Sequence, residues 1–277
     1  MTSQGRLLFE VEQLLRSYAK NDPHLENRPC LPLAFFAAII DKWIVAKKYK
    51  DELLTGLCEL TLLAVFGGLR SCEYSTSQDE STLTERLRAN DISFKFIGSP
   101  QNLTRRNADF VLFRFRNQKN GIKNQTIARP RAKTQHLRHF CPVLVAASLI
   151  NRIRSYPEAN PFINSVRIKN STRLISYQEI LDFQKQVARE LGESLGFDPS
   201  QYGTHCLRIT FATWLYNAGF PDAIIKTEGR WQSDAFLRYI RSNNTRETFN
   251  VTLAINSYQN NSSIIFYPFF FQTKKTS

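Results

Sequence analysis

Five side chains spread along the sequence could do chemistry together. They are Arg70 in Gly-Leu-Arg-Ser-Cys-Glu, His205 and Arg208 in His-Cys-Leu-Arg, Trp231 in Gly-Arg-Trp, and Tyr239 in Arg-Tyr-Ile-Arg. Guanidinium groups stay protonated and bond two phosphate oxygens at once, and a tyrosine hydroxyl is a nucleophile. With a histidine and an indole N–H donor, these are the parts needed to attack a phosphodiester without a metal ion. The pattern therefore indicates phosphoryl transfer.

Arg70 follows an apolar stretch that ends in a Gly-Gly pair, a place from which a side chain can project into a cleft. Negative charge gathers on the non-bridging oxygens of a phosphodiester in its pentavalent state, and a guanidinium group stabilises it. Glu73 lies three residues on, on the same helical face, and is expected to orient the arginine. The alternative is an ordinary surface pair of arginine and glutamate.

His205 and Arg208 are also three residues apart, which puts both on one face near the positive end of a predicted helix. This spacing adds a second phosphate-binding guanidinium beside a group that can transfer a proton. Trp231 is expected to donate its indole N–H to a phosphate oxygen. Tyr239 is the expected nucleophile, although the apolar stripe around it also fits a buried structural tyrosine.

The order and the local sequences of these motifs resemble those of the tyrosine recombinase (phage integrase) family, over residues from about 30 to 245. The resemblance implies a site-specific recombinase or integrase that cuts and rejoins DNA strands through a 3′-phosphotyrosine intermediate, with no metal, ATP or cofactor. It also implies a hairpin lysine as the acid for the leaving 5′ oxygen. Lys119, beside an Asn-Gly turn, occupies that place, and Lys123 is the close alternative. The sequence from Trp231 to Arg241 looks most like the matching segment in the recombinases of eukaryotic crypton-type mobile elements.

Members of this family carry a helical core-binding domain before the catalytic domain. Here one predicted helix within residues 1–27 precedes a catalytic domain over 28–250, and residues 251–277 form a C-terminal tail. The expectation is a truncated copy or a protein that relies on a partner. The resemblance implies double-stranded DNA as a partner and self-association into a synaptic tetramer. Two alternatives stay open: a type IB topoisomerase-like enzyme, and a catalytically inactive DNA-binding relic of a mobile element.

The charge distribution agrees with a DNA partner. The 277 residues include 37 Lys/Arg against 24 Asp/Glu, a formal charge of +13, and residues 103–140 hold ten basic residues and one acid. Such a block with interleaved aromatics favours a polyanion, because phosphate contacts release counterions. The candidate DNA-binding residues are Arg105, Arg106, Arg114, Arg116, Lys123, Arg129, Arg131 and Lys133.

Other sequence features concern the compartment and possible metals. The five cysteines are scattered and lack any Cys-x-x-Cys pair, which is typical of reduced residues in an intracellular protein. We expect no signal peptide and no membrane span. The expected location is the nucleus if the source is eukaryotic and the cytoplasm otherwise. No acidic or His/Cys cluster suggests a metal site, so no metal and no cofactor are expected.

Hydrophobic periodicity predicts a mainly helical α+β fold of packed helices with a small three-stranded antiparallel sheet. The strands are predicted around 92–96, 111–115 and 126–128, with one basic face, and Tyr156–Leu174 reads as a loop. The two helices before Arg70 are apolar on much of their circumference and are expected inside the domain. The predicted helices cover 32–46, 51–66, 142–153, 176–192 and 204–218, and shorter ones begin at Pro221 and Ser233.

Overall fold

The computed structural model describes residues 28–76, 84–98, 104–118, 121–132, 139–192, 196 and 198–240. All of them belong to the first of two compact units, Met1–Ser242. The predicted N-terminal helix, the C-terminal tail, Lys119 and Lys133 lie outside the described residues. In the described ranges, no helix is long and apolar enough to cross a membrane.

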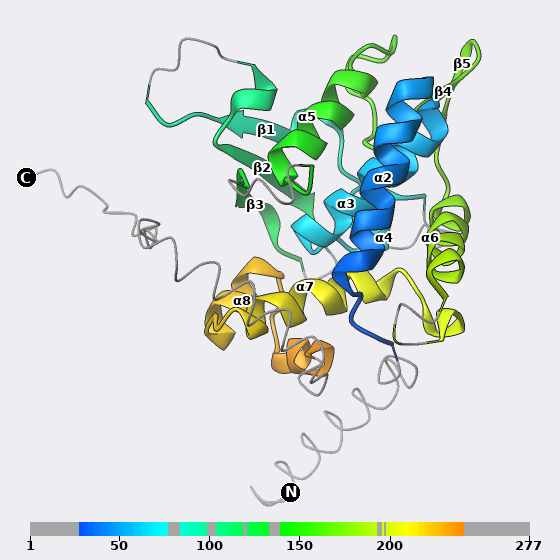
Figure 1. The fold of residues 1–277 in the computed structure, drawn as a ribbon. Coiled ribbons are helices and arrows are strands. Elements are labelled where there is room, and N and C mark those ends of the chain that lie inside the picture. The colour runs from blue at the N-terminus through cyan, green and yellow to red at the C-terminus, as the bar shows by residue number, and fades with distance from the viewer. Residues whose placement is uncertain are drawn as a thin grey trace, which may run out of the picture. The chain divides into compact units, whose positions relative to one another are not determined.

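The described fold is mainly helical with a small three-stranded antiparallel sheet, as predicted (Figure 1). The α-helices are α2 (Leu33–Tyr49), α3 (Glu52–Gly67), α4 (Ser71–Tyr74), α5 (Pro142–Ile153), α6 (Tyr177–Leu191), α7 (His205–Asn217) and α8 (Asp222–Glu228). Short 3₁₀ helices are η2 (Ala89–Asp91), η3 (Arg105–Asn107), η5 (Pro199–Gln201) and η6 (Asp234–Tyr239). The strands are β1 (Ile92–Lys95), β2 (Phe110–Asn117), β3 (Lys123–Pro130), β4 (Ser165–Ile168) and β5 (Ser171–Leu174).

Helix α3 forms the centre of this unit. Asp51 caps its first turn by accepting a hydrogen bond from the Leu54 backbone N–H at 2.9 Å, and Gly68 ends it in the left-handed conformation, with φ of 53°. Twelve of its 16 residues are buried, because α2, α5, α6 and α7 all pack against it. The prediction of a helix enclosed by the domain is confirmed for α3.

Helix α2 is enclosed on one face only, so the same prediction is wrong for it. Phe35, Ile39 and Trp43 are buried on the face that packs against α3 and α6. On the opposite face Ile44 and Val45 are 43% and 50% exposed. Apolar composition alone therefore does not report how many sides of a helix are covered.

The three-stranded sheet has the order β1-β2-β3, with neighbouring strands antiparallel. Ile92 lies opposite Phe113, and Phe113 opposite Ile127, and all three are buried on the face that packs against α5. Arg114 lies on the other face with half of its side chain exposed, and its Nη2 lies 3.2 Å from Asp91. The predicted alternation of an apolar face and an arginine-bearing face is confirmed.

The segment predicted as a loop, Tyr156–Leu174, instead contains an antiparallel hairpin of β4 and β5. Val166 lies opposite Arg173, and Ile168 opposite Ser171, so only two residues form the turn. The first of them, Lys169, has φ of 54°. The prediction is wrong because the many Asn and Ser residues suggested a loop, whereas strands this short leave little periodicity to detect.

The helices in the second half of the described chain begin near their predicted positions. Helix α6 starts in a capping box of Ser176 and Glu179 and ends at Gly192, as predicted. Thr204 precedes α7 without capping it, because its own backbone is already helical (φ −55°, ψ −24°). Tyr239 lies at the end of the 3₁₀ helix η6 rather than in an α-helix.

Candidate active site

Arg70 and Glu73 meet where the chain turns out of α3. Arg70 is the N-cap residue of the short helix α4, and its backbone N–H donates to Glu73 Oε2 at 2.8 Å. Its Nη1 donates to Glu73 Oε1 at 3.1 Å. The Arg70 side chain keeps 20% of its surface exposed, whereas that of Glu73 is fully buried. The structure thus brings together the two residues that the sequence paired.

Arg230 is a central member of the site that sequence reasoning did not identify. Its guanidinium donates to both oxygens of Glu73, Nη1 to Oε1 at 2.6 Å and Nη2 to Oε2 at 2.9 Å. Nη2 also donates to the Gly68 carbonyl at 3.1 Å, and the group stacks 3.6 Å above the Phe115 ring. From the sequence, an arginine next to Trp231 would be assigned to the surface. No local pattern indicates that Arg230 is buried.

Glu73 stays ionised despite its burial. Desolvation by itself would raise the pKa of this carboxyl group. The charge and hydrogen bonds of Arg230, followed by the charges of Arg70 and Arg208, outweigh that effect and lower the pKa from 4.5 to about 2. The carboxylate is therefore a negative charge beside the arginines at neutral pH.

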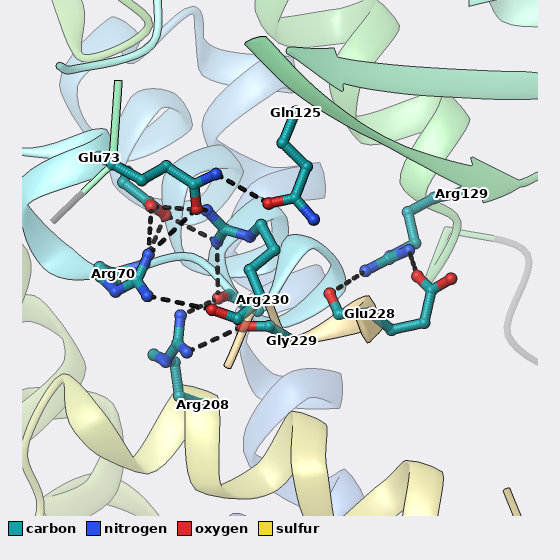
Figure 2. Close-up of polar contacts among 10 residues, drawn as sticks. Arg70, Glu73, Gln125, Arg129, Arg208, Glu228, Gly229 and Arg230 are labelled. Atoms are coloured by element: carbon teal, nitrogen blue, oxygen red, sulfur yellow. Dashed lines mark hydrogen bonds and ion pairs between the residues drawn. The ribbon is translucent and has the colours of Figure 1, made fainter. Parts of the chain in front are cut away.

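Arg208 reaches the same cluster from α7 (Figure 2). Its Nη1 donates to the Gly68 carbonyl at 2.6 Å and its Nη2 to the Gly229 carbonyl at 3.0 Å. Its guanidinium carbon lies 4.7 Å from the centre of the Trp231 ring, a cation–π contact. Burial, together with the charges of Arg70 and Arg230, lowers the pKa of Arg208 from 12.5 to about 9. The group is charged at neutral pH but has little negative charge around it.

His205 and Tyr239 form a hydrogen-bonded pair next to this cluster. The distance between His205 Nε2 and the Tyr239 hydroxyl is 2.9 Å, and their ring centres are 5.2 Å apart. Burial, and then the charges of Arg208, Arg28 and Arg70, lower the pKa of His205 from 6.5 to about 3. The imidazole is therefore neutral at neutral pH, and in the tautomer with its proton on Nδ1 its Nε2 accepts a hydrogen bond from the tyrosine hydroxyl.

Trp231 packs between the arginine cluster and Tyr239. Its ring lies so close to Gly229 that a Cβ atom at that position would clash with the indole. The ring centres of Trp231 and Tyr239 are 5.5 Å apart. The indole N–H stays a candidate donor to a ligand.

The end of the β2–β3 hairpin is tied to the arginine cluster through Gln118. Its Oε1 accepts hydrogen bonds from Arg230 Nη1 at 3.1 Å and from Arg70 Nη1 at 3.4 Å. Its Nε2 donates to Gln125 Oε1 at 2.8 Å, which links it to β3. Lys123 is exposed at the start of β3, opposite Asn117. Lys119 directly follows Gln118 in sequence but lies outside the described residues, so the choice between the two lysines stays open.

The candidate DNA-binding residues differ in exposure. Arg106, Arg114 and Lys123 are exposed. Arg105 and Arg116 are partly exposed and held by neighbours, Arg105 by Asn151 and Arg116 by Glu85 and Asp91. Arg114 also contacts Asp91, at 3.2 Å, although half of its side chain is exposed, so Arg106 and Lys123 have the most accessible charges of this group.

Two further arginines of the basic block donate hydrogen bonds to backbone carbonyls of the protein itself. Arg129 is 9% exposed, donates from Nε to the Phe66 carbonyl at 2.6 Å, and forms an ion pair with Glu228. Arg131 Nε donates to the Ala108 carbonyl at 2.9 Å. The DNA-binding role of Arg129 stays a prediction that its burial argues against, and Lys133 lies outside the described residues.

The site as a whole carries excess positive charge. Two guanidinium groups, of Arg70 and Arg230, contact the Glu73 carboxylate, and a third, of Arg208, lies beside them on backbone carbonyls, as Figure 2 shows. In the described part of the chain, the hydrogen bonds of these arginines reach Glu73, the Gln118 amide and backbone carbonyls. Such an arrangement can bind an anion, and Tyr239 and His205 add a nucleophile and a proton acceptor beside it.

Comparisons with known proteins give only distant structural likeness. No protein-family model matches the chain, and no curated protein matches it. Two solved structures of the Tn1549 transposon integrase are similar. One, in complex with transposon right end DNA, has a TM-score of 0.38 and 12% identity and covers 76% of this chain. The other, in complex with a circular intermediate DNA, has a TM-score of 0.39 and 14% identity and covers 83%. The chain spans 64% and 66% of the lengths of those two chains.

Proposed function

We propose that this protein cuts and rejoins DNA strands as a tyrosine recombinase does, with Tyr239 as the nucleophile. The observation that carries the proposal is the 2.9 Å contact between the Tyr239 hydroxyl and His205 Nε2, beside a cluster of three arginines, two of which contact the single carboxylate of Glu73. A buried structural tyrosine needs no such excess of positive charge nearby. An attacking tyrosine at a phosphodiester does, because negative charge develops in the transition state.

In the proposed reaction, the Tyr239 oxygen forms a bond to phosphorus and the bond from phosphorus to the 5′ oxygen breaks. The hydroxyl proton passes to neutral His205, and Lys119 or Lys123 supplies a proton to the leaving 5′ oxygen. Arg70 and Arg208 would donate to the non-bridging oxygens, since each nitrogen that Arg208 turns to a carbonyl keeps a second N–H. The reverse attack by a 5′ hydroxyl rejoins the strand, and ATP is not needed because one phosphodiester replaces another.

Binding of a phosphodiester would also change the pKa of His205, the proposed proton acceptor. The pKa of His205 is low because of burial and because Arg208, Arg28 and Arg70 carry like charge. A phosphodiester anion next to these arginines offsets their charge and raises the pKa of His205. The histidine therefore becomes a better base when DNA is in place.

Duplex DNA is the proposed substrate and the exposed residues Arg106, Arg114 and Lys123 the proposed backbone contacts. The same proposal includes a likeness to crypton-type recombinases, assembly into a synaptic tetramer, and a nuclear or cytoplasmic location. They rest on the resemblance of the motifs and on the charge of the chain.

The first prediction tests the nucleophile. The native chain is incubated in a metal chelator with nicked duplexes that carry a randomised sequence around the nick, so that cleavage releases a short strand and traps the enzyme. Tyr239→Phe should abolish the covalent adduct. Tyr216→Phe is the matched control, since Tyr216 is 43% exposed on α7 and should leave the adduct unchanged. Peptide mapping should place the modification on Tyr239.

Other outcomes identify the alternatives. An adduct that persists in Tyr239→Phe, or that forms only with added magnesium, would remove Tyr239 from the mechanism. Duplex binding without any adduct would favour the inactive relic. Relaxation of supercoiled DNA without exchange of strands would favour a topoisomerase-like enzyme.

A further inference from the structure

Arg230 is held in an unusual position at the centre of the site. Its backbone has φ of 60°, a conformation that a long side chain seldom adopts, and its side chain is fully buried. The Gly68 carbonyl and the Phe115 ring fix its guanidinium. Surrounding contacts must hold such a residue in place, which makes a specific role for it worth testing.

Arg230 and Arg70 compete for the same carboxylate. Arg230 contacts both oxygens of Glu73, at 2.6 and 2.9 Å, in the two-point geometry that suits a guanidinium and a carboxylate. The Arg70 guanidinium makes a single contact with Glu73, at 3.1 Å, and its backbone N–H takes the other oxygen. As a result the Arg70 side chain is tethered but still partly exposed.

We propose that Arg230 is a positioning residue that occupies Glu73 and so keeps the Arg70 guanidinium free to bind the scissile phosphate. This inference rests on the proposed function, since it assigns Arg70 to that phosphate. Without Arg230, Glu73 would be a buried carboxylate with Arg70 as its nearest cation, and the two would close into a two-point pair. The charge of Arg70 would then be neutralised inside the protein.

The backbone at Arg230 contributes to the same geometry. The Arg230 carbonyl accepts a hydrogen bond from Arg70 Nη2 at 3.3 Å, and the preceding Gly229 carbonyl accepts one from Arg208. The two residues before Trp231 therefore contact both phosphate-binding candidates. Gln118, which both Arg70 and Arg230 contact, extends this link to the hairpin.

The test compares single-turnover cleavage, DNA affinity and thermal unfolding of four variants with the wild type. Arg230→Met removes the charge and keeps most of the volume, and Arg230→Lys restores a positive charge. The double variant Arg230→Met with Glu73→Gln removes both charges. Arg152→Met is the matched control, because Arg152 pairs with the fully buried Glu59 at 2.9 Å in another part of the core.

Arg230→Met should cleave on the order of 100-fold more slowly at a temperature where it is folded, with DNA affinity unchanged. Arg230→Lys should recover part of the rate. The double variant should recover most of it, because a neutral Glu73→Gln side chain cannot capture Arg70. Arg152→Met should lose stability without losing cleavage rate. An unchanged rate in Arg230→Met, or a double variant as slow as Arg230→Met, would overturn the inference.

A crystal structure of Arg230→Met gives a readout that does not depend on activity. Two hydrogen bonds from the Arg70 guanidinium to Glu73 would support the inference, and an unmoved Arg70 would overturn it. If the wild type forms no adduct, the proposed function fails. The crystal structure of Arg230→Met still shows whether Arg230 keeps Arg70 from pairing with Glu73.

Discussion

Within the described residues, two glutamates, Glu59 and Glu73, are buried in opposite surroundings. Glu59 accepts hydrogen bonds from Arg152 Nε at 2.9 Å and from the Ser148 hydroxyl at 2.7 Å, so one guanidinium faces one carboxylate. Glu73 is shared by Arg70 and Arg230, and Arg208 lies next to them without a carboxylate of its own. One cluster is balanced in charge, whereas the other carries a surplus.

The pKa values of the arginines express this difference. Burial lowers the pKa of Arg152, but the charge of Glu59 and the hydrogen bonds with Glu59 and Tyr156 more than compensate, and the net shift is upward. Burial lowers the pKa of Arg208 as well, and Arg70 and Arg230 lower it further, to about 9. In a balanced pair each buried charge is compensated by its partner, whereas a surplus of buried charge costs stability and is useful only if an anion binds there.

The largest effect is expected from breaking the balanced pair. Arg152→Met leaves Glu59 as a buried charge without its guanidinium partner, so the free energy of unfolding should fall by about 3–5 kcal/mol. Urea unfolding followed by tryptophan fluorescence measures this change. Adding Glu59→Gln should recover much of the loss. If Arg152→Met were as stable as the wild type, the balanced cluster would not be a stabilising element.

The next effect concerns the surplus charge. Arg208→Ala should slow single-turnover cleavage by about 10²–10³-fold, equivalent to about 3–4 kcal/mol of transition-state stabilisation. DNA affinity should change little, because duplex binding is spread over many phosphates and this side chain meets one. Filter binding alongside the cleavage assay separates the two quantities. Equal losses in both assays would mean that Arg208 is a general DNA contact.

The smallest effect is a pH dependence of stability that belongs to Glu73. Its pKa in the folded protein, about 2, lies below the ordinary 4.5, so the unfolded chain binds the proton more readily. The stabilising contribution is therefore complete above about pH 4.5 and is lost as the pH falls toward about 2. The advantage of the wild type over Glu73→Gln in unfolding free energy should shrink by on the order of 3 kcal/mol across that interval.

Glu179 is the control for this pH dependence. Its pKa is also lowered to about 2, mainly by its hydrogen bond with Arg173, but 33% of its side chain is exposed. Added salt should therefore weaken the contribution of Glu179 and leave that of Glu73 nearly intact. Equal salt sensitivity of the two would show that the Glu73 cluster is open to solvent.

Local features of the fold were predictable from the sequence. The apolar run that ends at a Gly-Gly pair predicted α3, and the Ser-x-x-Glu capping box predicted the start of α6. The alternation around Phe113 predicted β2. Short elements were not predictable: the β4–β5 hairpin is too brief to show a period, and the choice between an α-helix and a 3₁₀ helix at Tyr239 depends on what η6 packs against.

Several members of the candidate site were predictable from the sequence, but Arg230 and the electrostatics of the site were not. The spacing of Arg70 with Glu73 and of His205 with Arg208 predicted local pairs, and the fold brings these pairs together around Gly68 and Gly229. Arg230 could not be predicted, because its place beneath the site depends on contacts with residues more than a hundred positions away. Long-range burial is a property of the tertiary structure, which local patterns do not encode.

The C-terminal end of α3 supplies the site with negative charge that comes from backbone carbonyls rather than from a carboxylate. The last turn of this helix contains no basic residue, yet the fold brings three arginines to its final carbonyls: Arg129 to Phe66, and Arg208 and Arg230 to Gly68. The aligned peptide dipoles of a helix place about half a negative charge at this end, and that charge cannot be titrated. The long apolar helix that forms the core thus also acts as a fixed counterion. Any substitution that frays its last turn should loosen all three arginines at once, even without touching a charged residue.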